Sequence, residues 1–105
     1  MTSTEPLAAG AAHDSILPQF ERWRVTASQC CVGVTSASGL RNRLHEFHGV
    51  PENGLCDQCP CISGDEAQKV CRQFLQDGCS DGGCEQMDDA TVVYVYVKAS
   101  GITTP

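Results

Sequence analysis

Residues 56–84 read CDQCPCISGDEAQKVCRQFLQDGCSDGGC, and they hold six of the eight cysteines of this 105-residue chain. Such a density is typical of either a disulfide framework or a metal cluster. The chain has only three Phe, one Trp and two Tyr, so apolar burial alone would leave a domain of this size marginally stable. Disulfide bridges, each stabilising by about 2–4 kcal/mol, would make up the difference.

The strongest local signal in this stretch predicts a helix at 64–77. Ser63 and Glu66 match a capping box, an apolar stripe follows, and Gly78 occupies the position where a helix C-cap favours glycine. Cys71 lies on the apolar stripe. We therefore expect Cys71 to be buried and to form a bridge into the sheet that the helix covers.

Two strands are predicted, one on either side of residues 56–84. The clearer one is 91–97, TVVYVYV, which is rich in β-branched and aromatic residues. The other begins at Phe20, where apolar and polar residues alternate. Its phase slips near Ser28, so either a bulge re-aims the strand before Cys30 or both faces of the strand are covered.

Between these strands, Leu40, Leu44 and Phe47 recur at helical spacing and predict a short amphipathic helix that stops at Gly49. A turn at 51–54 follows. The next segment, 55–62, is expected to be extended, although Pro60 argues against a central strand.

The predicted order is strand, helix, extended piece, helix, strand. It indicates an α+β fold with a split βαβ plan, in which a small disulfide-stapled sheet carries two helices packed on one face. We expect residues 1–19 to be a flexible N-terminal arm or the remnant of a pro-segment. Residues 20–99 would form a single disulfide-rich domain, and 100–105 a tail.

All eight cysteines are candidates for disulfide bonds: Cys30, Cys31, Cys56, Cys59, Cys61, Cys71, Cys79 and Cys84. Neighbouring cysteines on a strand point to opposite faces, so Cys30 and Cys31 should bond different partners, and one of them should bond Cys71. An even count does not require four internal bridges. Three bridges with two remaining thiols also fit, and a remaining thiol could bond a partner.

Composition limits the partners. Seven basic and thirteen acidic residues give a net charge of -6, which argues against nucleic acid or anionic lipid. No apolar run reaches the length of a membrane span, so membrane insertion is not expected. The cysteine content predicts a secreted, extracellular protein, on the assumption that a signal peptide has been removed.

A metal or redox centre is the alternative use of the cysteines. Cys56-x2-Cys59 with Cys79-x4-Cys84 loosely matches a zinc site of an intracellular interaction module, but it leaves four cysteines unused. A redox Cys-x-x-Cys would stand at a helix start, and Cys59 precedes the helix cap by four residues. His45 and His48 are typical of a polar flank beside an apolar stripe. We expect no metal and no cofactor.

Catalysis is not expected either. The chain has no nucleophile elbow of the Gly-x-Ser-x-Gly type and no signature of a cysteine protease. Its paired carboxylates, such as Asp88 and Asp89, lie in a polar loop that is typical of solvated charge.

With metal, redox and catalytic functions not expected, the sequence favours a disulfide scaffold that acts by binding a partner. A strand with Cys30-Cys31-Val32, two amphipathic helices of which the second carries Cys71, and a late cysteine before the closing strand resemble the virally encoded killer toxins of smut fungi. Those toxins carry Cys-x-Cys where this chain has an adjacent pair. The same fold recurs in small secreted effectors of plant-pathogenic fungi, some of which act in pairs.

The resemblance implies a secreted effector of a plant-pathogenic fungus that acts by protein binding, either on a host target or with a second secreted effector. A secreted antimicrobial or killer-toxin-like protein is the close alternative. With both helices on one face of the sheet, the other face would expose Tyr94 and Tyr96, which we predict to bind the partner. If these tyrosines belong to the core, the acidic loop 80–89 is the next candidate surface.

Overall fold

The computed structural model describes residues 5–84 and 89–103. Within them, one mixed sheet has the strand order β2-β4-β1-β3, built from β1 (Cys30–Thr35), β2 (Cys56–Pro60), β3 (Ser80–Asp81) and β4 (Val92–Val97). Strand β4 runs antiparallel to both β1 and β2, so β1 and β2 are parallel with β4 inserted between them. This is a split βαβ arrangement, and it confirms the predicted α+β class.

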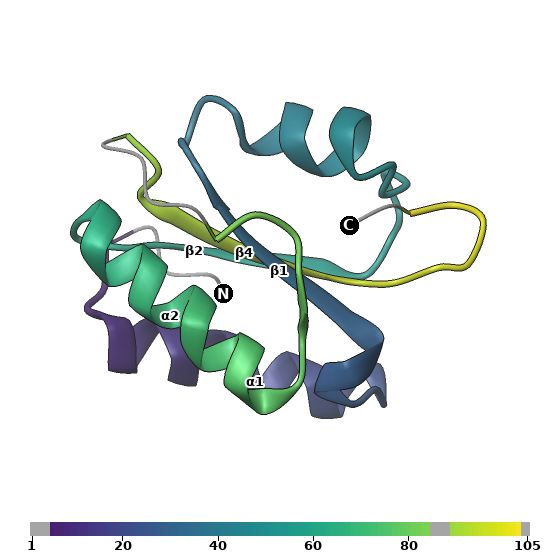
Figure 1. The fold of residues 1–105 in the computed structure, drawn as a ribbon, viewed down its shortest axis with the longest axis horizontal. Coiled ribbons are helices and arrows are strands. Elements are labelled where there is room, and N and C mark those ends of the chain that lie inside the picture. Colours follow the sequence, from purple (N-terminus) through teal and green to yellow (C-terminus); the bar gives the residue numbers. More distant parts are fainter. Residues whose placement is uncertain (1–4, 85–88, 104–105) are drawn as a thin grey trace.

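Helices cover the sheet from both sides, as Figure 1 shows. Helices α1 (Ala9–Trp23) and α2 (Gly64–Asp77) pack side by side on one face, with their buried residues in one cluster. A short π-helical segment, η2 (Asn42–Phe47), lies on the opposite face. The 3-10 turn η1 (Ala27–Gln29) leads into β1.

Two helices do pack on one face, but they are not the two that the sequence predicts. The predicted first helix corresponds to η2, and it covers the face that was expected to stay open. We call the side with α1 and α2 the helical face; from the sheet it receives Val32, Val34, Val93 and Val95. We call the other side the tyrosine face; it receives Cys31, Tyr94 and Tyr96.

Helix α1 corrects the predictions for the N-terminal part of the chain. A flexible arm at 1–19 and a strand from Phe20 are both wrong over residues 9–23, which are helical. The buried positions recur every three or four residues at Ala9, Ala12, Ile16 and Phe20. Alanines give this stripe a weak apolar signal, and Pro18 reads as a loop residue although it lies inside the helix.

Helix α2 has the predicted bounds and the predicted caps. The Ser63 hydroxyl accepts a hydrogen bond from the Glu66 amide at 3.2 Å, and Gly78 adopts a left-handed φ of 118°. The stripe buries Cys71 and Phe74 completely against the helical face. On the adjoining helix, the imidazole of His13 bonds the carboxylate of Asp77 at 2.7 Å and so links α1 to α2.

The predicted extended piece is an edge strand, and the described part of the predicted tail forms a turn. Strand β2 is an edge strand that ends at Pro60, in line with the prediction that Pro60 excludes a central position. Leu7 pairs with Cys61 just beyond the end of β2. A turn joins Pro51 to Gly54, and the described part of the tail, up to residue 103, forms a further turn after β4.

Candidate functional site

The two tyrosines predicted to bind a partner are buried. Tyr94 and Tyr96 have no solvent exposure, so their prediction as a contact surface is wrong for this structure. They stack on each other with ring centroids 6.5 Å apart, beneath η2 and the residues that follow it. Gly33 lies opposite Tyr94 on β1, and a Cβ there would come within 2.6 Å of the tyrosine Cζ. The missing side chain makes room for the ring.

His48 explains why two tyrosines can be buried together. It is fully buried, and its Nε2 lies 2.7 Å from the Tyr94 hydroxyl, while its Nδ1 lies 3.0 Å from the Tyr96 hydroxyl. Tyr94 donates to the carbonyl of Gly82 at 3.3 Å, so we assign the imidazole proton to Nε2 and let Tyr96 donate to Nδ1. His45 instead bonds the Val50 carbonyl at 2.7 Å, so the two histidines do not share a ligand.

Burial favours the protonated form of the two tyrosine hydroxyls. It raises the pKa of both tyrosine hydroxyls above the usual value, with Arg43 opposing the rise at Tyr94. The hydroxyls therefore stay protonated and can act as the donors that the histidine and the Gly82 carbonyl require.

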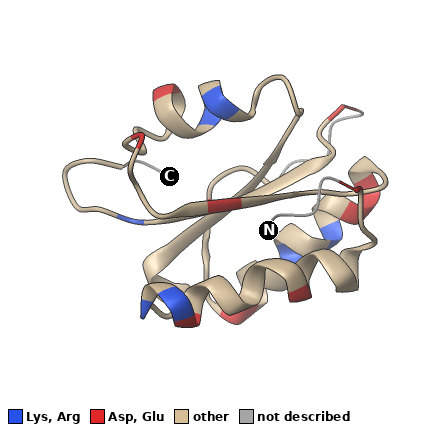
Figure 2. Ribbon diagram, turned by 180° about the vertical axis from the view of Figure 1, so that it is seen from behind, with Lys and Arg blue, Asp and Glu red and all other residues tan. Residues whose placement is uncertain are grey.

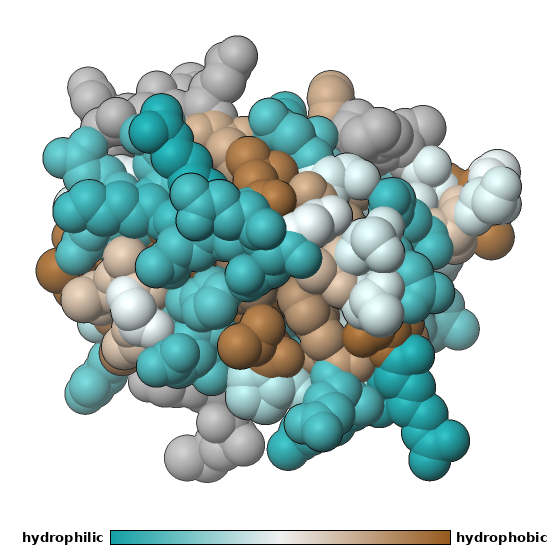
Figure 3. Space-filling view, turned by 60° about the horizontal axis from the view of Figure 1, so that its bottom comes forward, coloured by the Kyte–Doolittle hydropathy of each residue, from teal (hydrophilic) through white to brown (hydrophobic). Residues whose placement is uncertain are grey.

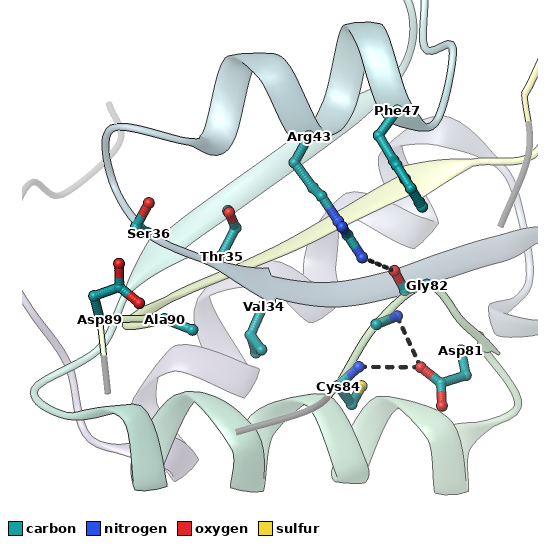
Figure 4. Close-up of a pocket in the computed structure, with 11 residues that line it drawn as sticks. Val34, Thr35, Ser36, Arg43, Phe47, Asp81, Gly82, Cys84, Asp89 and Ala90 are labelled. Carbon is teal, nitrogen blue, oxygen red and sulfur yellow. Dashed lines mark hydrogen bonds between the residues drawn. The ribbon is translucent and has the colours of Figure 1, made fainter. Parts of the chain in front are cut away.

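A groove of about 520 Å³ opens at the edge of the tyrosine face (Figure 4). One wall is η2, with Arg43 and Phe47, and the other is the segment that follows β3. The predicted acidic loop 80–89 contributes part of this second wall through residues 81–84 and 89; residues 85–88 lie outside the described residues.

Arg43 is held in the wall of the groove by two hydrogen bonds and by contact with an aromatic ring. Its Nε donates to the Tyr94 hydroxyl and one terminal nitrogen donates to the Gly82 carbonyl, both at 3.3 Å. Its guanidinium carbon lies 4.0 Å from the centroid of the Phe47 ring, within cation–π distance. Among the described residues, no carboxylate forms an ion pair with Arg43. The remaining N–H groups of its planar fork are available to a ligand.

Phe47 forms the apolar part of the same wall. The sequence placed it on a buried helical stripe, but 54% of it is exposed. The π-helical geometry of η2 turns Leu44 inward and leaves Phe47 at the rim. The sequence could have indicated that Arg43 and Phe47 contact each other, because residues four apart on a helix are neighbours.

The opposite wall is held by a tight turn. One carboxylate oxygen of Asp81 accepts hydrogen bonds from the amides of Gly83 at 2.8 Å and Cys84 at 3.1 Å. The Gly82 amide donates to the Val32 carbonyl at 2.7 Å, which anchors the turn to β1. Asp89 is exposed at the far end of the groove. The groove thus combines one fixed cation, one exposed ring and carboxylates within a pre-formed frame.

The cysteines lie on both faces of the sheet. Cys71 bonds Cys84, with Cα atoms 5.7 Å apart, so the predicted bond from Cys71 to Cys30 or Cys31 is wrong here. Cys84 lies in the core of the helical face beside α2, at the end of the turn that follows β3. The other six cysteines are free thiols, of which only Cys56 is partly exposed. Cys30 and Cys31 point to opposite faces, as expected.

The four cysteines of the zinc alternative do not converge. Cys56 packs on the tyrosine face and Cys59 on the helical face, because residues three apart on a strand point to opposite sides. Cys84 is used in the disulfide. Within residues 5–84 and 89–103, no three His, Cys, Asp or Glu side chains are grouped to hold a metal ion.

The remaining surface is mixed in character. Acidic and basic residues are scattered along the described part of the ribbon (Figure 2). Toward the helical side, small apolar patches are separated by hydrophilic side chains (Figure 3). The described helices include none that combines the length and apolarity needed to cross a bilayer.

No protein-family model matches this chain, and neither a curated protein nor a solved structure matches it. We therefore infer its function from the chemistry of the groove and the cysteines.

Proposed function

We propose that this chain is a secreted, disulfide-stapled effector that acts by binding a protein partner in the groove beside η2. Arg43 is the observation that carries this proposal. Its guanidinium is fixed by two hydrogen bonds and an aromatic ring, and among the described residues it has no carboxylate partner. Arginine and aromatic residues contribute most to binding energy at protein interfaces.

The groove selects a partner by charge and shape. A carboxylate on the partner can take a bidentate hydrogen bond from Arg43, and an apolar side chain beside it can pack on the exposed ring of Phe47. A basic residue on the partner would form an ion pair with Asp89 at the other end of the groove. Because Arg43 is already held in place, binding costs little side-chain entropy.

Secretion is supported by the cysteine content and by the small core. Eight cysteines in 105 residues, one pair of them already bridged, fit an oxidising compartment better than a reducing one. The effector role, the plant-pathogenic fungus as source and a possible second effector as partner all derive from the resemblance to the smut-fungus toxins and related effectors.

A cross-linking experiment with matched variants tests the proposal. The oxidised protein, carrying a photo-cross-linker on its N-terminal amine, is incubated with extracellular fluid from plant leaves and separately with the culture medium of the producing organism. Arg43→Lys keeps the charge but removes the fork. Arg41→Lys is the control, because Arg41 precedes η2 immediately, is exposed and pairs with Glu52 outside the groove.

We expect one cross-linked protein in one of the two pools, with at least tenfold weaker binding for Arg43→Lys and unchanged binding for Arg41→Lys. Equal binding by all three proteins would exclude the groove. Inhibition of microbial growth by the purified protein, without a cross-linked partner, would favour the antimicrobial alternative. Eight free thiols with bound zinc in the protein as purified from its source would overturn secretion itself.

A further inference from the structure

Two of the free thiols lie side by side at the start of neighbouring strands. Strands β1 and β3 are parallel, and Cys31 pairs with Ser80 and Val32 with Asp81. One step back along both strands, the same register places Cys30 opposite Cys79. Neighbouring strands lie about 4.8 Å apart, and disulfides join Cα atoms about 4.4–6.8 Å apart.

Both side chains also point to the same side. Residues at matching positions of neighbouring strands share a face of the sheet, and Cys30 and Cys79 both belong to the core of the helical face. Cys30 has no solvent exposure and Cys79 has 6%. Neither thiol therefore has an outside partner within reach.

Electrostatics agrees with this proximity. Burial raises the pKa of Cys79 to about 12, and the sulfur of Cys30 is the next largest contribution to that rise. Burial likewise raises the pKa of Cys30 to about 11, with a further contribution from Cys31. Two thiols this deeply buried are poor nucleophiles once the fold is complete.

We propose that Cys30 and Cys79 form a second disulfide bond, made during folding, that ties the C-terminal end of α2 to the start of β1. The two thiols lose two protons and two electrons and gain one S–S bond. A disulfide donor, such as oxidised glutathione or a thiol oxidoreductase, accepts them and becomes two thiols. The bond forms by exchange through a mixed disulfide, while the sulfurs are still accessible.

The other cysteines are less well placed to compete. Cys31 points to the tyrosine face, and Cys71 and Cys84 are bonded to each other. Cys59 and Cys61 belong to β2 and its end, which β4 separates from β1. At two strand spacings, the Cα distance from Cys30 exceeds the disulfide range.

The bond would add a tie where the backbone has few contacts. Strand β3 is two residues long and is joined to α2 only through Gly78 and Cys79. A bridge at Cys79 would hold this short edge strand against β1 and fix the turn that forms one wall of the groove. The inference goes beyond the proposed function, since it needs an oxidant but no binding partner.

Peptide mapping of refolded protein tests the bond. The reduced chain is refolded with oxidised and reduced glutathione, remaining thiols are blocked with N-ethylmaleimide in denaturant at mildly acidic pH, and the protein is digested without reductant. Trypsin releases residues 25–41 with Cys30 and Cys31, 70–72 with Cys71, and 73–98 with Cys79 and Cys84. Cleavage before Asp81 then separates Cys79 from Cys84.

We expect 25–41 to be joined to the fragment that carries Cys79, and 70–72 to the fragment that carries Cys84. Because Cys30 and Cys31 share a peptide, the map is repeated on Cys31→Ser, which should keep the link, and on Cys30→Ser, which should lose it. A wild-type map with Cys79 blocked by maleimide, or joined to 44–69, would overturn the proposal. So would loss of the link in Cys31→Ser when its circular dichroism matches wild type. Neither result would touch the binding proposal, which is tested with groove variants.

Discussion

The two faces of the sheet are filled by different chemistry although one strand, β4, supplies both. Its valines enter the helical face, where aliphatic and aromatic side chains of α1 and α2 meet cysteines. Its tyrosines enter the tyrosine face, where their hydroxyls bond His48 from both sides. The helical face is held by apolar burial and by the Cys71–Cys84 bridge. The tyrosine face depends on complete pairing of polar groups.

This difference explains where the groove lies. Arg43 can be held rigidly at the surface because the Tyr94 hydroxyl and the Gly82 carbonyl, both part of the buried network, accept its hydrogen bonds. A purely aliphatic face offers no such acceptors. The polar core therefore positions Arg43, the side chain that we propose for binding.

The largest expected effect is loss of the helical face on reduction. The Cys71–Cys84 bridge closes a short loop, which corresponds to about 3 kcal/mol, and a Cys30–Cys79 bridge would close a loop of about 50 residues and add about 4 kcal/mol. Reduction at neutral pH should therefore unfold most molecules at 25 °C. Trp23 packs on this face, so its near-ultraviolet circular dichroism reports the loss of tertiary structure on reduction. A retained Trp23 signal in fully reduced protein would show that the core suffices.

Phe74→Ala should have the next largest effect. Phe74 is fully buried in the helical face, with the Phe20 ring 5.6 Å away and the His13 ring 4.5 Å away. Its removal should lower the free energy of unfolding by about 3–5 kcal/mol, as measured by urea denaturation. Phe47→Ala is the matched control, because Phe47 is 54% exposed. It should cost less than about 1 kcal/mol. Similar losses in both variants would contradict the assignment of the faces.

Local sequence signals predicted some of these features well. Helix α2 followed from Ser63, its apolar stripe and Gly78, all within one segment, and its bounds match. Strand β4 followed from its own alternation. Helix α1 was missed because its buried stripe begins with two alanines and because Pro18 lies inside it, so that only packing against α2 reveals the helix.

Long-range arrangement accounts for what the sequence could not predict. The alternation in β4 shows that its valines and tyrosines point to opposite faces of the sheet. It does not show which helix covers each face, and the sequence therefore led to the prediction that Tyr94 is exposed. The partner of Cys71 likewise depends on the path of the chain after β3. Arg43 was not singled out, since its value comes from a hydroxyl and a carbonyl that are 51 and 39 residues away in sequence.

Tyr94→Phe tests the tyrosine face with a smaller change. It removes the hydroxyl oxygen that lies 2.7 Å from Nε2 of His48 and accepts a hydrogen bond from Nε of Arg43. We expect a loss of about 1–3 kcal/mol in the free energy of unfolding, because the buried network loses the hydroxyl that joins His48, Arg43 and the Gly82 carbonyl. Partner binding should weaken as well.

A double-mutant cycle sharpens this prediction. Tyr94→Phe and Tyr96→Phe act on the same imidazole, so their effects should couple by about 0.5 kcal/mol or more. Additive losses would show that the two hydroxyls are energetically independent and that the network is not a unit.

The last expected effect is a decline of stability at alkaline pH, to which the buried tyrosines contribute. Burial raises the pKa of Tyr94 and Tyr96 in the folded protein above the value of 10.0 expected when unfolded. Folding therefore favours the protonated hydroxyl. Its stabilising contribution is complete below pH 10 and is lost as the pH rises above that value, by at most about 1.4 kcal/mol per pH unit for each group. Urea midpoints between pH 8 and 11, with tyrosinate absorbance followed in parallel, should show the decline.

Thiols titrate in the same range and must be separated from the tyrosines. Burial raises the pKa of Cys61 to about 11, so a free Cys61 adds a slope of the same sign that starts near pH 9. The comparison that isolates the tyrosine face is oxidised wild type against oxidised Tyr94→Phe, which carry the same cysteines. Tyr94→Phe should lose stability less steeply above pH 10, because one of the two buried hydroxyls is gone. Parallel curves for the two proteins would mean that Tyr94 ionises as freely in the folded chain as in the unfolded one, and that the network around His48 does not hold its proton.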